Sequence, residues 1–546
     1  MYTTKMDRQL SLIRQSKGDP ALAPLLCSLC SDRSPSMRLE AYGAMGSYVS
    51  VLSTQALLSV LPDLLPHLLL SRYWGPEFQR WPSQNTWKNL VTRLDGLTEF
   101  GTEEETSEVV SPFLQAVSNG MALAAGTAPR GMTVSPSAAA ALAPGPQGGS
   151  RSGKLLLHQH VEDLGLFYID RLHSALLSLR ECCSTTDSPM NTSAHPPSIG
   201  LSYAVMEAEA LVNCTSELVG KGPRVGVRRH VKKLLGACWP FQWSLKSHLI
   251  VSEETLKPEA SPSLPLSTLS SPRSRSSLLA SLCDCAIVCC GKMLSTFPDE
   301  FTEEELSRAV VEWVDSDMIF HRWEDRPLRE HVAFSTGFVI ATSPPHLQAR
   351  LAPGLSRVIQ TRLGGRRLSL EAVLHIFGAE RYGEAHFSTA ACTVMEVEGA
   401  LYFLRELSAV DPQAASPLIP CLCTLAQKSL EVHRESIINS LPSISELHAL
   451  PLLQILWRCT PDIARSLGKL ETRKHLELLL PPLYATASLP TPSVPLQCDK
   501  PYDRSVAIRL AQEVRDARAT AFDCAATLSS LLGKEVFDPP LKRTMG

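Results

Sequence analysis

The stretch DRSPSMRLEAYGAMG, residues 32–46, decides the fold of this chain, because helical patterns flank it on both sides. Before it, the Asp19-Pro20 pair opens a segment with leucines at positions 22, 25, 26 and 29. After it, residues 54–70 place their leucines along one broad stripe. Apolar residues three and four positions apart lie on one face of an α-helix. The sequence therefore predicts three consecutive helices in this region.

The same stretch resembles the turn and the second helix of a HEAT repeat. In that family an Asp closes the first helix, where Asp32 stands here, and a Ser-Pro pair opens the second, where Ser34 and Pro35 stand. An Arg follows the first apolar residue of the second helix, as Arg38 follows Met37. The resemblance implies stacked helical hairpins that present a surface to other macromolecules.

We expect an all-α fold, an α-solenoid of HEAT-like helical hairpins interrupted by disordered linkers. The small residues Ala41, Gly43 and Ala44 would let a neighbouring helix approach closely, and residues 430–438 match the second helix of a HEAT unit loosely. A single hairpin leaves apolar area on two sides, so its neighbours must cover it. An ordinary helical bundle is the alternative, which the helix–turn–helix periodicity favours less.

Composition favours a helical, intracellular protein. The chain has 546 residues, more than one hydrophobic core usually serves. Its net charge of -3 gives no dominant attraction to nucleic acid or to an anionic membrane. Only 6% of its residues are aromatic, which favours helices over β-sandwiches. The 16 Cys, with no secretory signal in residues 1–17, indicate reduced, buried thiols in the cytoplasm or the nucleus.

Shifts in composition divide the chain into helical blocks and linkers rich in Pro, Ser, Gly or Ala. The expected segments are an N-terminal HEAT-like block (1–119), a disordered Ala/Gly/Pro linker (120–154), a middle helical block (155–250), a Ser/Pro-rich linker (251–277), the main helical repeat block (278–485), a Pro-rich linker (486–503), and a C-terminal long helix with a tail (504–546). We expect Pro539 and Pro540 to prevent a further helix after the long one.

The best candidate for a membrane span is residues 277–294. We expect this stretch to be a buried helix of the repeat block, because it is short and because Asp284 and Lys292 interrupt it. No membrane span is therefore expected.

A run of basic residues with aromatic residues close behind it is the first candidate interaction site. It consists of Lys221, Arg224, Arg228, Arg229, Lys232 and Lys233, followed by Trp239, Phe241 and Trp243. Such a run can engage phosphates and stack on bases, or bind an acidic segment of a partner. The alternative is a solvated helix face with the aromatic rings in the core behind it. The sequence leaves the two readings open.

The second candidate is the apolar seam of the C-terminal helix. Its large residues stand near the two ends, at Leu510, Val514, Leu528 and Leu531, with Ala517, Ala521 and Cys524 between them. Small central residues permit the close approach of another helix. We expect the seam to dock on the rest of the chain, and docking on a partner chain is the alternative.

Other motifs that resemble chemical sites are incomplete. Residues 148–155 nearly match a phosphate-binding loop, but Leu155 stands where the magnesium-binding Ser or Thr belongs. Cys27 and Cys30 form a lone Cys-x-x-Cys, and the Cys cluster at 283–290 lies on an expected helix, where neighbouring residues point in different directions. We expect no enzyme activity, no cofactor, no metal and no small-molecule substrate.

These observations favour a non-catalytic α-helical scaffold or adaptor that binds other proteins within a larger intracellular complex. A nucleic-acid-associated solenoid subunit using the basic run around Arg228 is the alternative. A third hypothesis is that the chain is part of a larger HEAT-repeat protein with a transport or trafficking role, since HEAT proteins serve in such assemblies. The sequence does not choose the partner.

The HEAT-like register generates a test. It predicts that Met37, Ala41 and Met45 face the core. Ala41→Asp would then bury an unpaired carboxylate between packed helices, at a cost of several kcal/mol, about 3 or more. We expect a markedly lower melting temperature in calorimetry of the purified chain. An unchanged melting temperature contradicts the register.

Overall fold

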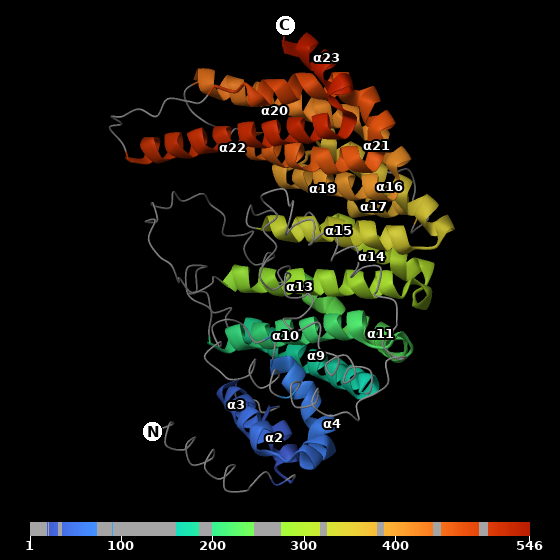
Figure 1. Cartoon of the computed structure of the whole chain (residues 1–546), viewed down its shortest axis with the longest axis vertical. Coiled ribbons are helices and arrows are strands. Elements are labelled where there is room, and N and C mark those ends of the chain that lie inside the picture. The colour runs from blue at the N-terminus through green and yellow to red at the C-terminus, as the bar shows by residue number, and fades with distance from the viewer. Residues whose placement is uncertain are drawn as a thin grey trace. The chain divides into compact units, whose positions relative to one another are not determined.

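The computed structural model describes residues 19, 21–30, 35–71, 73, 90, 160–184, 199–244, 275–316, 325–378, 387–439, 449–490 and 501–545. They belong to two compact units (Figure 1). The N-terminal unit comprises Met1–Thr255 and Thr268–Phe301, and the C-terminal unit comprises Leu256–Ser267 and Thr302–Gly546. Apart from one short pair of strands, every regular element among the described residues is a helix, so the expected all-α class is confirmed.

The N-terminal unit is built from helices that pack on their neighbours along the chain. Its elements are α2 (Leu22–Cys30), α3 (Pro35–Val51), α4 (Thr54–Ser71), α9 (Val161–Ser184), α10 (Ile199–Lys221), α11 (Arg224–Cys238), η3 (Trp239–Trp243), α13 (Arg275–Thr296) and η4 (Pro298–Glu300). Figure 1 shows α9, α10 and α13 in successive layers. Because α10 packs on both of its neighbours, it forms the centre of this unit.

The HEAT-like segment forms the predicted helices. Helix α3 begins at Pro35, as the resemblance implies, and packs on α2. Ala41 and Met45 are buried, with 3% and 0% of their surface exposed, but the expectation for Met37 is wrong, because it is 39% exposed. Residues four apart drift by about 40° around a helix, so Met37 and Met45, two such steps apart, point in directions that differ by about 80°. Residues 31–34 and the side chain of Arg38 lie outside the described residues.

Helix α13 is apolar because it lies in the core of the N-terminal unit. By length and composition alone, Leu278–Thr296 passes as a membrane span, contrary to the expectation that this stretch is too short, but 94% of that window is buried inside the protein. Helices α10 and α11 and the short helix η3 pack on α13. Lys292 is buried within it and donates to the backbone carbonyl of Ser216 and, over 3.2 Å, to the Ser216 hydroxyl. Burial lowers the pKa of Lys292 to about 8.

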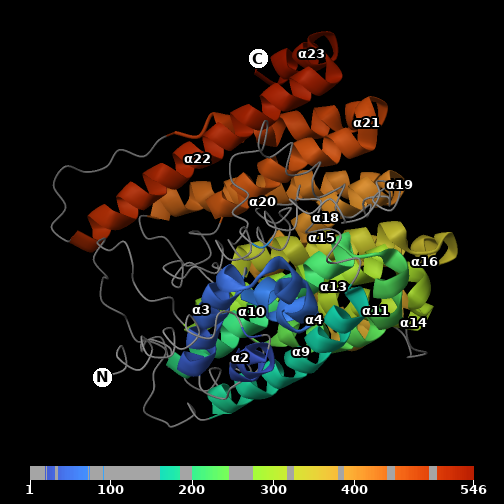
Figure 2. The ribbon, with the colours of Figure 1, turned by 60° about the horizontal axis from the view of Figure 1, so that its bottom comes forward.

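The C-terminal unit continues the same mode of packing. Its elements are α14 (Glu303–Ser316), α15 (Arg326–Thr342), α16 (Pro345–Leu363), β1 (Arg366–Leu368), α17 (Leu370–Phe377), β2 (Phe387–Ala391), α18 (Val394–Val410), α19 (Pro412–Ala415), η6 (Ser416–Leu418), α20 (Ile419–Asn439), α21 (Ala449–Ala487), α22 (Pro501–Leu532) and α23 (Lys534–Met545). Helix α18 packs on α15, α16 and α21, and α21 packs on α20 and α22 (Figure 2). The strands β1 and β2, which the sequence did not predict, pair antiparallel.

Helix α21 is a hairpin of two helices. Gly468 takes φ 79° and ψ 169° in its middle, a conformation outside the helical region. The indole Nε1 of Trp457 donates to Thr486 Oγ1 over 3.0 Å, although a straight helix would separate these residues by about 43 Å. Thr472 Oγ1 also donates to the carbonyl of Ala464 over 3.0 Å. The chain therefore reverses at Gly468.

Several expected boundaries differ from the structure. The block 278–485 is divided after Phe301, because α13 packs on α10 and α11 and so belongs to the N-terminal unit. The expected tail after the long helix is instead the helix α23, which contains Pro539 and Pro540. Gly533, with φ 91°, separates α22 from α23. Residues 120–154 and most of the other two expected linkers lie outside the described residues.

The reversal in α21 generates the second prediction. No atom lies within 4 Å of a Cβ added at Gly468, so Gly468→Ala would act through backbone strain alone and destabilise the C-terminal unit by about 1–3 kcal/mol. Gly236→Ala is the matched control, because Gly236 lies inside α11 and its added Cβ also meets no atom. We expect the control to be neutral or stabilising by about 1 kcal/mol. Equal effects in chemical denaturation would contradict this account.

Candidate functional site

The basic run lies at the end of α10 and along α11, where acidic residues of the same unit already pair with half of it. Lys221 Nζ lies 2.9 Å from Glu217 Oε1. Arg228 Nε lies 2.5 Å from the Glu300 carboxylate, with Asp299 at 3.8 Å.

The members of the run on α11 have more exposed side chains than Lys221. Arg229 pairs with Glu162 of α9. Arg224, Arg228, Arg229, Lys232 and Lys233 all have exposed side chains. Ion pairs between such exposed groups contribute little stability, about 0–1 kcal/mol each. They still reduce the net positive field of α11, because at least two of its arginines have an acidic neighbour.

The aromatic residues behind the run form part of the core. Phe241 is fully buried, and Trp239 and Trp243 are half-buried in η3. The short helix η3 packs on α13 and α11. Rings held in this way offer little open face on which a base could stack. The arrangement favours the solvated-face reading of the run, and binding of an anionic partner stays a prediction.

The C-terminal seam is covered by the same unit. Val514 and Leu528 are fully buried, Leu510 and Leu531 are half-buried, and the small central residue Ala521 has no exposed surface. Helix α22 packs on α21, and Gln454 Nε2 of α21 donates to the Glu513 carbonyl over 3.1 Å. The structure therefore places the seam against the chain's own α21.

Sequence reasoning missed a buried cluster of charges between α15, α18 and α21. At its centre the carboxylate of Glu398, with no exposed surface, accepts hydrogen bonds from three side chains. Arg326 Nε donates over 2.7 Å, Arg329 over 3.1 Å, and the Tyr402 hydroxyl over 2.9 Å. Arg329 also has no exposed surface.

The cluster continues through a second set of contacts. Arg405 contacts the carboxylates of Glu330 at 2.6 Å and Glu406 at 2.7 Å. Arg458 of α21 donates to the Tyr402 hydroxyl over 3.0 Å. Burial would raise the pKa of Glu330, but the nearby arginines Arg405 and Arg458 outweigh it and hold that pKa below its usual range. The cluster therefore ties three helices together, and its arginines favour the ionised form of Glu330.

A sequence signal for this cluster exists, although it is weak. Residues 326–330 and 396–406 interrupt apolar helical patterns with Arg and Glu at positions that face the core. Charged residues are almost never fully buried unless they are paired. From the sequence alone, nothing showed which residues pair across helices about 70 positions apart.

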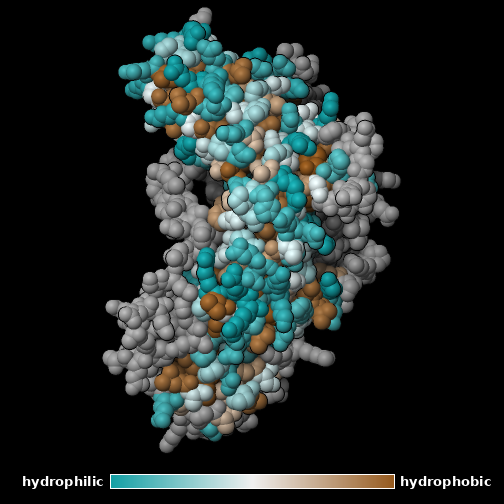
Figure 3. Space-filling model, turned by 90° about the vertical axis from the view of Figure 1, so that its right-hand side faces the viewer, coloured by the Kyte–Doolittle hydropathy of each residue, from teal (hydrophilic) through white to brown (hydrophobic). Residues whose placement is uncertain are grey.

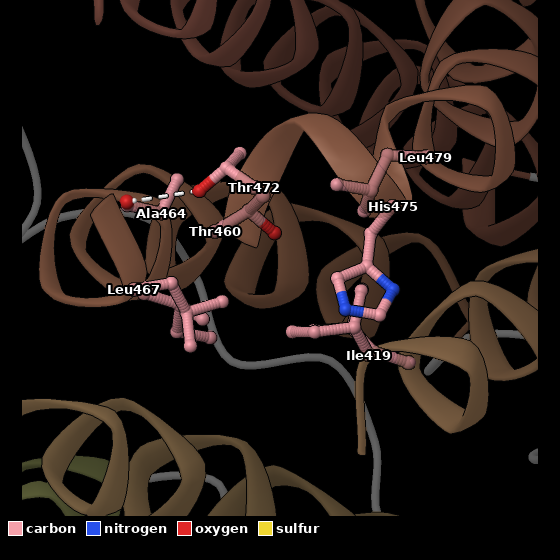
Figure 4. Close-up of a pocket in the computed structure, with 9 residues that line it drawn as sticks. Ile419, Thr460, Ala464, Leu467, Thr472, His475 and Leu479 are labelled. Carbon is pink, nitrogen blue, oxygen red and sulfur yellow. Dashed lines mark hydrogen bonds between the residues drawn. The ribbon is translucent and has the colours of Figure 1, made fainter. Parts of the chain in front are cut away.

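Figure 4 shows a small pocket in the C-terminal unit, and one of its lining residues, His475, takes part in a second polar contact. It is a shallow hollow, open to solvent, and it is lined mainly by apolar side chains of α20 and α21 together with His475. The Ser416 hydroxyl lies 2.9 Å from His475 Nε2 and 2.7 Å from Glu471 Oε1. Ser, His and Glu side chains also form catalytic triads, so the geometry of this contact decides whether it could act as one.

The geometry does not match a triad. In a triad the carboxylate orients the far ring nitrogen of the His, while the near nitrogen takes the proton of the Ser. Here Glu471 accepts directly from Ser416, and its nearest His475 atom is the same Nε2, at 4.0 Å. A serine that donates to the carboxylate cannot also donate its one proton to His475. The contact links η6 to α21 and is structural.

The buried cluster generates the third prediction. Glu398→Gln keeps the shape of the side chain but leaves Arg326 and Arg329 without their counter-charge, which should cost about 3–5 kcal/mol of unfolding free energy. Glu477→Gln is the control, because Glu477 and its partner Arg543 are both about 70% exposed. We expect the control to cost less than about 1 kcal/mol. Denaturant titration measures both, and similar small losses would show that the cluster is not essential.

Comparisons with known proteins add a distant likeness. No family model matches the chain, and no curated protein matches it by sequence. Among solved structures, a crystal structure of importin beta in an ammonium sulfate condition is similar at a TM-score of 0.34 and 10% identity. The match covers 98% of this chain and 66% of that chain, so this chain spans less than two thirds of the other's length.

A likeness this distant carries no information on activity or partners. The fold follows from the packing itself, since helices contact others within a few elements along the chain, such as α9 with α10 and α15 with α18, and α21 is a complete helical hairpin. Such neighbour packing is the property of helical repeat proteins. Within each unit the chain is an all-α, HEAT-like arrangement of helical hairpins.

Proposed function

We propose that this protein is a non-catalytic helical scaffold that binds other proteins within a larger intracellular complex. The observation that supports it most is that helices pack on others within a few elements along the chain, an arrangement that leaves outer helix faces open to a partner. Repeat proteins use such faces as extended binding surfaces.

The distribution of exposed apolar side chains supports the same proposal. Figure 3 shows hydrophobic residues in small groups among hydrophilic ones on one face of the molecule. Large apolar side chains that are about half exposed or more occur on several helices, namely Leu25, Leu166, Leu177, Val225, Leu470 and Phe522. Single exposed apolar residues are ordinary, but they supply anchors where a partner covers them.

An intracellular location fits the thiols of the chain. All 15 cysteines among the described residues are free, and ten of them are buried. Burial raises the pKa of Cys423 to about 12, which keeps the thiol protonated and unreactive. Reduced, buried thiols are typical of cytoplasmic and nuclear proteins. The transport or trafficking hypothesis rests on the HEAT resemblance alone.

The nucleic-acid alternative is less well supported. The arginines Arg228 and Arg229 of α11 already have acidic neighbours, and Phe241 behind them is buried. Binding to nucleic acid would have to displace these pairs. The purification experiment below therefore includes binding of nucleic acid as one of its outcomes.

The fourth prediction tests the scaffold. The tagged full-length chain, purified from its own cells with nuclease present, should retain at least one protein in fixed stoichiometry. That protein, made separately, should form an equimolar complex with the purified chain in analytical ultracentrifugation. Leu470→Asp with Phe522→Asp, at exposed positions of the C-terminal unit, and Leu25→Asp with Leu177→Asp, in the N-terminal unit, should leave the melting temperature unchanged.

At least one of these two double variants should weaken the complex, because a partner must cover part of one unit. If no protein binds in fixed stoichiometry, the scaffold proposal is wrong. If only nucleic acid co-purifies, and Arg228→Glu with Arg229→Glu removes it, the nucleic-acid alternative holds instead.

A further inference from the structure

The segment from α16 to α17 has an unusual charge for this chain. Residues 344–378 contain five arginines, at positions 350, 357, 362, 366 and 367, and one acidic residue, Glu371. Their net charge of five minus one is +4, whereas the whole chain carries -3. The remaining residues therefore carry -7, and the positive charge is concentrated in one short segment. Sequence reasoning missed it because the arginines are spread out and form no run.

Three of these arginines have exposed side chains on the α16–β1 segment. Arg350 and Arg357 are seven residues apart, so they point in nearly the same direction from α16. Arg366 follows at the start of β1, just beyond the end of α16. We call Arg350, Arg357 and Arg366 the arginine face.

The arginine face lacks the neutralisation seen on α11. Among the described residues, Arg357 and Arg366 have no acidic partner, and Arg350 donates only to the Ser307 hydroxyl, over 2.9 Å. The other two arginines of the segment are used internally, since Arg362 donates to the Val314 carbonyl over 2.7 Å and Arg367 lies 3.2 Å from Glu396. The three exposed guanidinium groups therefore keep their charge and their donors available.

Packing holds this face in place. The opposite side of α16 is buried, with Leu351, Leu355 and Val358 against the core. Gly354 lies so close to α17 that a Cβ there would approach Phe377 to 2.8 Å, and Ser356 Oγ donates to the Ala414 carbonyl over 3.0 Å. A rigid helix presents its side chains at fixed spacing, which reduces the entropy lost on binding.

We propose that the arginine face binds an acidic, extended segment of a partner protein. The inference rests on the scaffold function and names the chemistry of one partner surface. Guanidinium groups bind carboxylates with two parallel hydrogen bonds, which favours Arg over Lys for this task.

The spacing of Arg350 and Arg357 determines where acidic residues should stand in the partner segment. Arg350 and Arg357 are separated by about 10 Å along the helix. A peptide in the extended polyproline II conformation, with three residues per turn, covers that distance in about three residues and returns to the same face. Acidic residues at every third position of the partner would therefore meet both arginines. Leu370, 46% exposed at the start of α17, offers an apolar contact on the same segment.

A peptide fits this surface better than a single-stranded nucleic acid. Binding of bases needs exposed aromatic rings between the cations. The one Phe in residues 344–378 is Phe377, which is fully buried, and this segment contains no Tyr or Trp.

The fifth prediction uses a fluorescein-labelled peptide of repeating Glu-Ser-Gly and the full-length protein. Fluorescence anisotropy should show binding that weakens as salt rises, because exposed charges are screened. Arg350→Glu with Arg357→Glu should weaken binding at least about tenfold. Arg509→Glu with Arg515→Glu, the same change of charge on two exposed arginines of α22, is the control and should change binding less than about twofold.

The outcomes separate the possibilities. No binding by the wild type, or equal loss in both double variants at unchanged melting temperature, overturns the proposal. Tighter binding of a uridine oligonucleotide that the same two substitutions remove would assign the face to nucleic acid instead. If a stoichiometric partner is found but the peptide does not bind, the scaffold stands and this inference fails. If the peptide binds but no partner protein is found, the scaffold function fails instead.

Discussion

The structure depends on one constraint, which is that every helix must bury its apolar face against a helix close to it in the chain. In the N-terminal unit this places α10 between α9 and α13, and in the C-terminal unit it places α18 between α15, α16 and α21. The central helices are therefore buried nearly all round, and α13 even has the composition of a membrane span. Elements at the margins, such as α11 and α22, keep one polar face.

The same constraint determines which charged side chains of this protein must be paired and which remain exposed. Where Arg and Glu lie between helices, as at Arg329 and Glu398, they must pair completely, because an isolated buried charge is very costly. On α11 the exposed arginines lie near acidic residues of neighbouring elements and are partly neutralised. On α16 the exposed Arg350 and Arg357 have no acidic partner among the described residues. This contrast, rather than charge density in the sequence, distinguishes a candidate binding face from an ordinary solvated one.

Much of the fold could be predicted from local pattern. Pro35 marks the start of α3, as the resemblance implies, and Ala41 and Met45 of that helix are buried as expected. Features that depend on distant partners could not be predicted. Periodicity does not reveal that α21 reverses at Gly468, because apolar residues such as Leu467 and Leu470 continue through the turn.

The candidate sites show the same limit. The run near Arg228 was visible because its residues are adjacent in sequence, whereas the arginine face required knowing that Arg350 and Arg357 share a helix surface without acids. The reverse error occurred with α23, because Pro539 and Pro540, which we expected to prevent a further helix, lie in the middle of one.

Hydrogen exchange of the full-length chain, followed by mass spectrometry, tests the central claim of neighbour packing most directly. Backbone amides exchange slowly where helices are covered on several sides and quickly where they are at a margin. The account predicts the slowest exchange in α10, α13 and α18, and faster exchange in α2, α11 and α23. Exchange in α10 and α18 that is as fast as in α11 and α23 would contradict it.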